Sequence, residues 1–226
     1  MDHENEKKIA AREAVKLVKE GMVVGLGSGS TCAYMIRMLG KQVAKGLDVK
    51  GVPSSRATEK LALEAGIPLI SLADAKQLDI NIDGADEFDP DLQLIKGGGG
   101  ALLREKVLAH NARFNVIIAD SSKEVEQLGH YKLPVETIPF ATRSILAELK
   151  EAWLKPVIRE ENGSPYVTDE NNYIIDLDII GVPDLQELQD RLIRIPGLVE
   201  TGLFLDSTDL LIMGQGKAAV IKKRDE

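Results

Sequence analysis

The sequence has little of what several functional classes require. Among its 226 residues it has a single cysteine, Cys32, so an intrachain disulfide is impossible and a cysteine-rich metal site is excluded. Aromatic residues make up 4% of the chain and its net charge is -8, whereas nucleic-acid binders typically show a basic face with aromatic stacking groups. No apolar stretch approaches the roughly 20 residues needed to cross a bilayer. We therefore expect neither nucleic-acid binding nor a membrane span.

Signals for metal binding, hydrolysis and export are also missing. The three histidines, His3, His110 and His130, have no metal-ligand spacing, and no serine lies in a nucleophile elbow. The N-terminal segment mixes acids with bases and lacks the apolar core of a signal peptide. We therefore expect a cytoplasmic protein, and nucleophilic hydrolysis has little support.

The pattern of the first 131 residues predicts an α/β fold. Short β-branched runs alternate with stretches in which apolar residues recur at helical spacing. Such alternation predicts a Rossmann-like, doubly wound and mostly parallel sheet with helices on both faces. The predicted helices cover residues 6–20, 32–43, 55–65 and 101–112, and the predicted strands cover residues 22–26, 49–53, 68–71, 78–82 and 115–119.

The pattern changes in the following segment, where two helices alternate with antiparallel-looking strands. This predicts a smaller α+β, ferredoxin-like domain over residues 132–206, which we expect to act as a lid or in oligomerisation. Residues 1–131 and 207–226 form the predicted catalytic domain, because the apolar tail suits a strand that returns to the first sheet. The predicted elements are helices over residues 141–153 and 185–193, and strands near Val157, over 173–179, just before Leu203 and within 209–223.

A glycine-rich loop follows the first predicted strand. In GLGSGST, residues 25–31, Gly27 and Gly29 let the backbone wrap an anion at a helix N-terminus. The segment is not a dinucleotide fingerprint, because Ser30 replaces the third glycine, and it lacks the Gly-Lys-Ser/Thr ending of a P-loop. A tight turn with a Ser/Thr cap is the alternative. The candidate binding residues here are Ser28, Gly29, Ser30 and Thr31.

Acidic residues follow the predicted strand 78–82. Asp83 and Asp86 lie at the carboxyl edge of the sheet, where open α/β sheets bind ligands. Carboxylates there can hold sugar hydroxyls, but a magnesium site and an acidic turn have comparable weight on this evidence. Gly84 and Ala85 lie between the two acids and belong to the same candidate site.

A second glycine loop precedes the predicted helix 101–112. Four consecutive glycines cost much backbone entropy and are hard to justify unless something approaches closely. On the helix, Glu105 has apolar neighbours three and four residues away, which would raise its pKa toward neutrality and suit a general base. An alternative of equal weight is that the helix is buried and its charged side chains are paired with one another. The candidate loop residues are Lys96, Gly97, Gly98 and Gly99.

Two lysines complete the set of candidates. Lys123 follows the predicted strand 115–119 and so lies at the same sheet edge as the other loops. Lys7 is near the start of the first helix. Taken alone, each is an ordinary solvated lysine.

Together, these motifs resemble the ribose-5-phosphate isomerases of the A type. GLGSGST, PSSRAT, DGADE, KGGGGALLREK, DSSK, LPVE and PGLVETGLF follow in this order, so the resemblance covers nearly the whole chain. It implies interconversion of D-ribose 5-phosphate and D-ribulose 5-phosphate through an enediol in the pentose phosphate pathway. It also implies that no metal or organic cofactor takes part, and that the protein is a homo-oligomer, either a dimer or a tetramer.

The resemblance also implies a role for each matching residue. Glu105 would be the base that moves a proton between two carbons, and Lys96 would stabilise negative charge on oxygen. Asp83 and Asp86 would handle hydroxyls and ring opening. One departure is Leu103, where the family usually has threonine, so a hydroxyl near the base is missing. The implied substrate-binding residues are Ser28, Gly29, Ser30, Thr31, Gly84, Ala85, Gly97, Gly98, Gly99, Lys123 and Lys7.

Two other functions are compatible with the predicted fold. A sugar-phosphate-sensing domain of a transcription regulator would share the phosphate loop, but it would lack a base and would carry a helix-turn-helix that we do not find. A nucleotide-dependent dehydrogenase or transferase would need the third glycine that residues 25–31 lack. Fold alone does not distinguish these functions.

Overall fold

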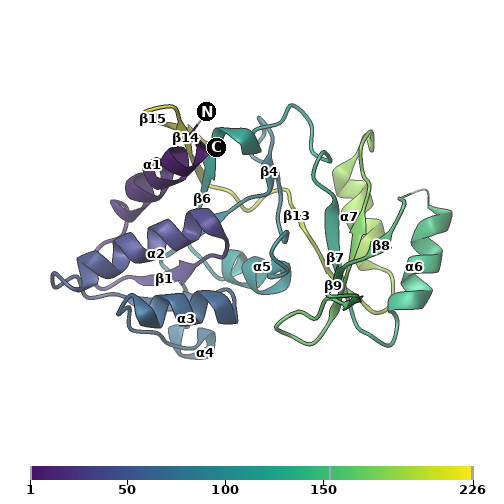
Figure 1. Ribbon diagram of the computed structural model, residues 1–226, viewed down its shortest axis with the longest axis horizontal. Helices are drawn as coiled ribbons and strands as arrows, with labels where there is room; N and C mark the ends of the chain where they lie inside the picture. The colour runs from purple at the N-terminus through teal and green to yellow at the C-terminus, as the bar shows by residue number, and fades with distance from the viewer. Residues whose placement is uncertain (1, 153, 225–226) are drawn as a thin grey trace. The chain divides into compact units, whose positions relative to one another are not determined.

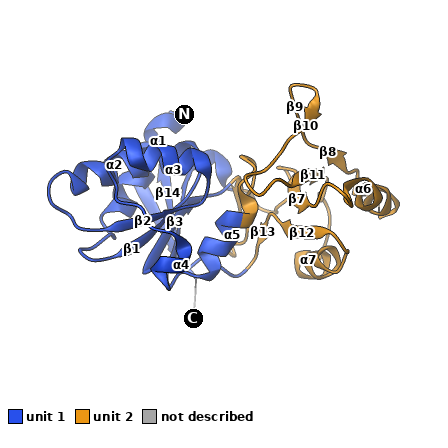
Figure 2. Cartoon of the chain, turned by 90° about the horizontal axis from the view of Figure 1, so that it is seen from below, with its two compact units in different colours: residues 1–85, 104–124, 206–226 blue, residues 86–103, 125–205 orange. Residues whose placement is uncertain are grey.

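The computed structural model describes residues 2–152 and 154–224. The chain divides into two compact units (Figure 2): the first comprises residues 1–85, 104–124 and 206–226, and the second comprises residues 86–103 and 125–205. The stretches 86–103 and 125–131, which the sequence prediction assigned to the catalytic domain, thus belong to the second unit. Within the described residues, no helix has both the length and the apolar character for a membrane crossing.

The first unit is built on a six-stranded sheet of order β15-β14-β6-β3-β1-β2. All neighbouring strands are parallel except β14 and β15, which pair antiparallel at one edge. The predicted mostly parallel sheet is confirmed, and the tail does return to it. The strands are β1 (Val23–Leu26), β2 (Lys50–Pro53), β3 (Ile80–Gly84), β6 (Asn115–Asp120), β14 (Leu210–Gln215) and β15 (Ala218–Lys223).

Helices cover both faces of this sheet. Two long helices, α1 and α2, pack on the face that carries Val24 and Ile82 (Figure 1). Leu108 and partly buried Leu72 join a smaller apolar cluster with Val23, which points to the opposite face because successive strand residues alternate. The doubly wound prediction is therefore confirmed. The helices are α1 (His3–Val15), α2 (Ser30–Val43), α3 (Arg56–Glu64), α4 (Leu72–Ala75), α5 (Leu102–His110) and the 3-10 helix η1 (Ser121–Lys123).

Three predicted elements of this unit differ from the structure. Helix α1 ends at Val15 rather than residue 20, because residues 16–18 turn through successive i→i−3 backbone hydrogen bonds. Residues 68–71 form no strand; Leu69 makes one isolated bridge to Gly51. The tail forms two strands where one was predicted, since Gly216, with a φ of 60°, allows a tight turn between them.

The second unit contains the predicted ferredoxin-like arrangement. Its elements follow in the order strand, helix, strand, strand, helix, strand, and the sheet order is β12-β7-β11-β8 with all neighbours antiparallel. Leu149 and Leu188 of the two helices pack in one core with Val135 and Leu177 of the sheet. The elements are β7 (Leu133–Thr137), α6 (Thr142–Glu151), β8 (Val157–Ile158), β11 (Tyr173–Leu177), α7 (Leu185–Ile193) and β12 (Leu198–Thr201).

Five short strands of this unit were not predicted. They are β4 (Glu87–Phe88), β5 (Leu94–Ile95) and β13 (Leu203–Phe204), which form a three-stranded sheet, and the hairpin of β9 (Glu160–Glu161) and β10 (Ser164–Pro165). Helix α6 ends at Glu151, and residue 153, the predicted end of this helix, lies outside the described residues.

Candidate functional site

The loop after β1 is fixed to Asp83 at the end of β3. A Cβ atom on Gly27 would lie 2.1 Å from Oδ1 of Asp83, so no residue larger than glycine fits there. The same oxygen accepts hydrogen bonds from the amides of Ser28, at 3.1 Å, and Gly84, at 2.7 Å. Asp83 is 1% exposed. One buried carboxylate therefore joins the predicted loop to the predicted acidic segment at the carboxyl edge of the sheet.

A cluster of hydroxyl groups supports this loop from the start of α3. The Ser28 hydroxyl lies 2.8 Å from that of Ser54 and 2.9 Å from that of Ser55. Thr58 lies 3.0 Å from Ser28 and donates to the carbonyl of Gly27 at 3.1 Å. Sequence reasoning did not assign Ser54, Ser55 or Thr58 to the site, although PSSRAT was among the motifs of the resemblance. The run of small hydroxyl residues was the available signal.

The loop ends at an exposed helix N-terminus. Gly29, with a φ of 94°, is the N-cap of α2, no side chain caps this end, and the first turn contains no acidic residue. Gly29 and Ser30 are exposed, and Thr31 is half-buried. Uncapped amides at the positive end of a 14-residue helix suit an anion. The structure thus places Ser28, Gly29, Ser30 and Thr31 in a turn whose geometry suits an anion.

Glu105 lies in the first turn of α5 and is 6% exposed. Leu102, Leu108 and Ala109, three and four residues away, are also buried. The apolar surroundings predicted from the sequence are therefore present. A buried carboxylate in the first turn is favoured by the helix dipole but disfavoured by the loss of water.

Lys123 and Lys7 have different surroundings. Lys123 ends η1, directly after β6, so it lies at the predicted carboxyl edge of the parallel sheet and is half-buried. Lys7 is on α1 and forms an ion pair with Glu4 at 2.7 Å. Glu4 also accepts a hydrogen bond from the Tyr34 hydroxyl at 2.6 Å. Lys7 is thus part of a link between α1 and α2.

Glu6, which sequence reasoning did not single out, is fully buried on α1. Its carboxylate accepts hydrogen bonds from the Gly216 amide and the Ser121 hydroxyl, both at 2.7 Å. These bonds, led by that from Gly216, lower its pKa to about 2. His3, Glu6 and Asp120 form the one group of three possible metal ligands among the described residues. Because protein donors already bind both oxygens of Glu6, we assign it a structural role.

In the second unit, Asp86 is joined to the loop of four glycines. The Gly98 amide donates to Oδ2 of Asp86 at 2.7 Å. A Cβ atom on Gly98 would lie 2.6 Å from Oδ1 of Asp86 and from the Tyr131 hydroxyl oxygen. Gly97 and Gly100 have φ values of 97° and 81°. Close approach therefore explains Gly98, and left-handed backbone explains Gly97 and Gly100.

Lys96 is buried at the start of this loop, with 3% of its surface exposed. Its Nζ lies 5.4 Å from the centroid of the Phe204 ring, within the range of a cation–π contact. Its amide donates to the carbonyl of Gly202 at 2.9 Å. The ammonium group is thus in a partly apolar place, where its charge acts on neighbours with little screening.

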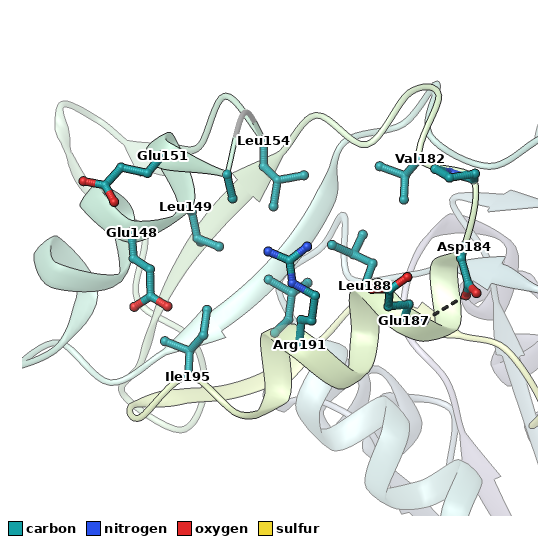
Figure 3. A pocket seen from close by; sticks show the side chains of 13 residues that line it. Glu148, Leu149, Glu151, Leu154, Val182, Asp184, Glu187, Leu188, Arg191 and Ile195 are labelled. Atoms are coloured by element: carbon teal, nitrogen blue, oxygen red, sulfur yellow. Dashed lines mark hydrogen bonds between the residues drawn. The ribbon is translucent and has the colours of Figure 1, made fainter.

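A groove of about 480 Å³ lies elsewhere in the second unit, between α6 and α7 (Figure 3). Its lining includes apolar Leu149 and Leu188, acidic Glu148 and Glu187, and Arg191, whose side chain extends into it. None of the predicted site residues lines this groove. The groove is therefore not part of the predicted site.

Comparisons with known proteins identify the family of this chain. The model of ribose 5-phosphate isomerase A (phosphoriboisomerase A) matches residues 50–218. The ribose-5-phosphate isomerase A of Sphingopyxis alaskensis is 45% identical over 221 residues, which cover 98% of this chain and 97% of that protein. That of Ruegeria pomeroyi is 48% identical and covers 94% of this chain and 84% of the relative.

Solved structures agree with the sequence relatives. A D-ribose-5-phosphate isomerase in complex with phospho-erythronic acid has a TM-score of 0.96 and 39% identity, and the match covers 99% of this chain and 100% of that chain. Ribose 5-phosphate isomerase A from Methanocaldococcus jannaschii has a TM-score of 0.91 and 42% identity, with coverage of 96% and 97%. This chain belongs to the ribose-5-phosphate isomerase A family.

Proposed function

We propose that this protein interconverts D-ribose 5-phosphate and D-ribulose 5-phosphate through an enediol, in the non-oxidative branch of the pentose phosphate pathway. Membership of the family supports the reaction class. The structural observation that carries the proposal is the open N-terminus of α2, whose preceding loop is held by the buried carboxylate of Asp83. This arrangement joins a phosphate-binding turn to a group that can hold sugar hydroxyls.

The phosphate is the handle of the substrate in this proposal. Amides of residues 28–31 bind it, and Lys123 and Lys7 add positive charge. Binding energy from this non-reacting end orients the carbons that react. Gly84 and Ala85 of the acidic segment, and the backbone of Gly97, Gly98 and Gly99, contact the rest of the sugar.

Glu105 is the proposed base. Its carboxylate removes the proton from C2 of the open-chain aldehyde and returns it to C1, while a proton moves from the C2 hydroxyl to the C1 oxygen. A positioned carboxylate of suitable pKa accelerates such a step by roughly 100- to 10,000-fold. Lys96 stabilises negative charge on the enediolate oxygen. Asp83 and Asp86 hold hydroxyls and assist ring opening.

A complex in the family is consistent with this chemistry. One solved relative binds phospho-erythronic acid, which pairs a phosphate with a carboxylate. A carboxylate is planar and negatively charged, as an enediolate is, so such a molecule suits a site complementary to the intermediate. We expect the same compound to inhibit this protein in competition with ribose 5-phosphate.

The test is conversion of ribose 5-phosphate by purified protein in excess chelator. We expect ribulose 5-phosphate to form until equilibrium is reached, with no added metal or organic cofactor, and phospho-erythronic acid to raise the apparent KM. No conversion by folded protein would overturn the proposal. Binding of ribose 5-phosphate without turnover would instead favour a sugar-phosphate sensor.

We also propose that the protein is a homo-oligomer, a dimer or a tetramer, and that the second unit serves as a lid or in oligomerisation. The Phe140 side chain, between β7 and α6, is 97% exposed, and that of Ile138 is 39% exposed. Exposed apolar groups close together favour a partner surface. Light scattering tests this: Phe140→Ser should lower the mass per particle, and a monomeric wild-type protein would refute the proposal.

The cytoplasm is the proposed location. The chain has a single cysteine, Cys32, which is buried, and a sequence that does not use disulfides is typical of a reducing compartment. Fractionation of cells that produce the protein tests this proposal, and recovery with secreted or membrane fractions would contradict it.

A further inference from the structure

The four-glycine loop has no side chains of its own to hold it. Gly97 and Gly100 adopt left-handed φ values, and the Gly100 amide donates to the carbonyl of Gly97 at 2.9 Å. Gly99 is exposed, and a Cβ atom built on it would meet nothing within 4 Å. Unsupported glycines lose the most conformational entropy on ordering. The order of this loop must therefore come from side chains outside it.

Arg159 supplies two contacts to consecutive carbonyls of the loop. Its Nη1 donates to the Gly97 oxygen at 2.9 Å and to the Gly98 oxygen at 3.0 Å. The other side of the guanidinium donates to both oxygens of Asp176, from Nε at 3.0 Å and from Nη2 at 2.5 Å. Because guanidinium is planar and its bonds to the carboxylate are paired, its orientation is fixed.

The charge of Arg159 is retained in this place. Burial is the largest single effect and would lower its pKa, but the hydrogen bonds and charge of Asp176, together with smaller contributions from Tyr131 and Tyr166, raise the pKa on balance. A cation on a peptide oxygen polarises the whole peptide group, so the N–H of the next residue becomes a stronger donor. The affected amides are those of Gly98, which binds Asp86, and of Gly99, which is exposed.

We propose that Arg159 is a positioning residue of the isomerase: held by Asp176, it fixes the Gly97 and Gly98 carbonyls and so presents the Gly98 and Gly99 amides in the geometry that substrate binding needs. This inference rests on the proposed function, in which the loop contacts the sugar. Tyr166 adds a weaker contact of the same kind, because its hydroxyl donates to the Gly99 carbonyl at 3.2 Å.

A nearby ion pair provides the control. Lys155 and Asp178 pair at 2.9 Å, and like Arg159 and Asp176 they join the segment around β8 to the segment around β11. Asp178 is bound by Lys155 and by the Ile180 amide rather than by the glycine loop. A role limited to joining these segments would make Arg159→Met and Lys155→Met alike in their effect on catalysis.

The kinetic test compares four variants with wild-type protein. We expect Arg159→Met to lower kcat/KM about 100-fold, the usual cost of a misplaced site, through both KM and kcat. Arg159→Lys should retain only part of the kcat/KM that Arg159→Met loses, because an ammonium group cannot bind two carbonyls and two carboxylate oxygens in one plane. Lys155→Met should stay within about two-fold of wild type. Added methylguanidinium should restore part of the activity of Arg159→Ala.

A spectroscopic test does not depend on activity. Residues 97–100 are the only consecutive glycines in the sequence, so labelling glycine with ¹³C at the carbonyl and ¹⁵N at the amide isolates the Gly98, Gly99 and Gly100 amide signals. Arg159→Met and Arg159→Lys should shift the Gly98 and Gly99 signals, whereas Lys155→Met should not.

The outcomes separate the two proposals. If the Arg159 variants shift the Gly98 and Gly99 signals but the wild-type protein does not isomerise ribose 5-phosphate, the proposed function is rejected. The support of the loop by Arg159 then still stands. An active, folded Arg159→Met with wild-type kcat and KM, or with unshifted Gly98 and Gly99 signals, would overturn the positioning role. Should Arg159→Met fail to fold, Arg159→Lys decides by the same readouts.

Discussion

The two glycine loops of this protein are held by different chemistry. In the first unit, the 27–31 loop contacts neutral hydroxyls and one carboxylate, and its amides continue into a 14-residue helix. In the second unit, the 97–100 loop binds a cation at two carbonyls and a carboxylate at one amide. A helix aligns the amides of its first turn without further help. A run of glycines outside a helix needs charged partners to reach comparable order.

The largest expected effect on stability is at Asp83. Asp83→Ala removes a buried carboxylate that accepts from the half-buried amides of Ser28 and Gly84, and should cost about 3 kcal/mol of unfolding free energy. Asp86→Ala should cost about 1 kcal/mol, because Asp86 is half-buried and binds one amide. Both variants should lose activity. Urea unfolding measures the loss of stability in each variant. Equal losses would contradict the view that the two loops depend on their carboxylates to different extents.

The next effect concerns Glu6, which belongs to the first unit. Its pKa of about 2 in the folded protein lies below the ordinary value of 4.5, so its contribution to stability is present above 4.5 and is lost as the pH falls toward 2. Glu6→Gln should be less stable than wild type at pH 7 by about 2 kcal/mol. Between pH 4.5 and about 2 it should lose less unfolding free energy than wild type does. Thermal unfolding between pH 7 and 2 measures this. Parallel pH profiles of the two proteins would contradict it.

A smaller effect is expected from Thr58→Val, which removes one hydroxyl of the cluster under the first loop. We expect a loss of about 1 kcal/mol and a rise in KM of about ten-fold, since the support of Ser28 and Gly27 is weakened. Thr142→Val is the matched control in the second unit, because its buried hydroxyl donates to the Ile138 carbonyl. It should lose similar stability with KM unchanged. A similar rise of KM in both variants would mean that KM follows the loss of stability, and would contradict a specific role of Thr58 in supporting the first loop.

The smallest effect is at Glu136 of β7, the counterpart of Glu6 in the second unit. Burial raises the pKa of Glu136, although hydrogen bonds from Asn172 and Thr168 oppose this. Its ionisation therefore costs stability, and that cost appears as the pH rises through the raised pKa. Glu136→Gln keeps an acceptor for both donors and should be more stable at pH 8 by up to about 1 kcal/mol. Lower stability of Glu136→Gln than of wild type at pH 8 would contradict the conclusion that ionisation of Glu136 costs stability.

The sequence was informative wherever burial is periodic. Helix α7 begins and ends where the apolar spacing predicts, at Leu185 and Ile193. Residues 68–71 look equally apolar, but after its bridge to Gly51 the chain turns into α4 instead of extending the ladder. Strands of two residues, such as β4 and β5, are too short to show any period. Their pairing depends on tertiary contacts that local pattern does not contain.

The same limit applies to the site. Ser28, Asp83 and Glu105 could be proposed from the sequence because each follows a strand or a glycine loop. Arg159 lies 62 residues from Gly97 in sequence and reaches the loop only through the register of β8 on β11. Nothing local to Arg159 distinguishes it from a surface arginine. Residues that hold a loop are therefore harder to find from sequence than residues that line it.

The most direct test of the account is proton exchange at the reacting carbons in D₂O. Wild-type protein and Glu64→Gln, which changes an exposed glutamate, should incorporate deuterium from solvent into the sugar phosphate during turnover. Glu105→Gln should bind phospho-erythronic acid but lose both conversion and exchange by about 1,000-fold. A folded Glu105→Gln that still exchanges the C2 proton at the wild-type rate would contradict the assignment of Glu105 as the base.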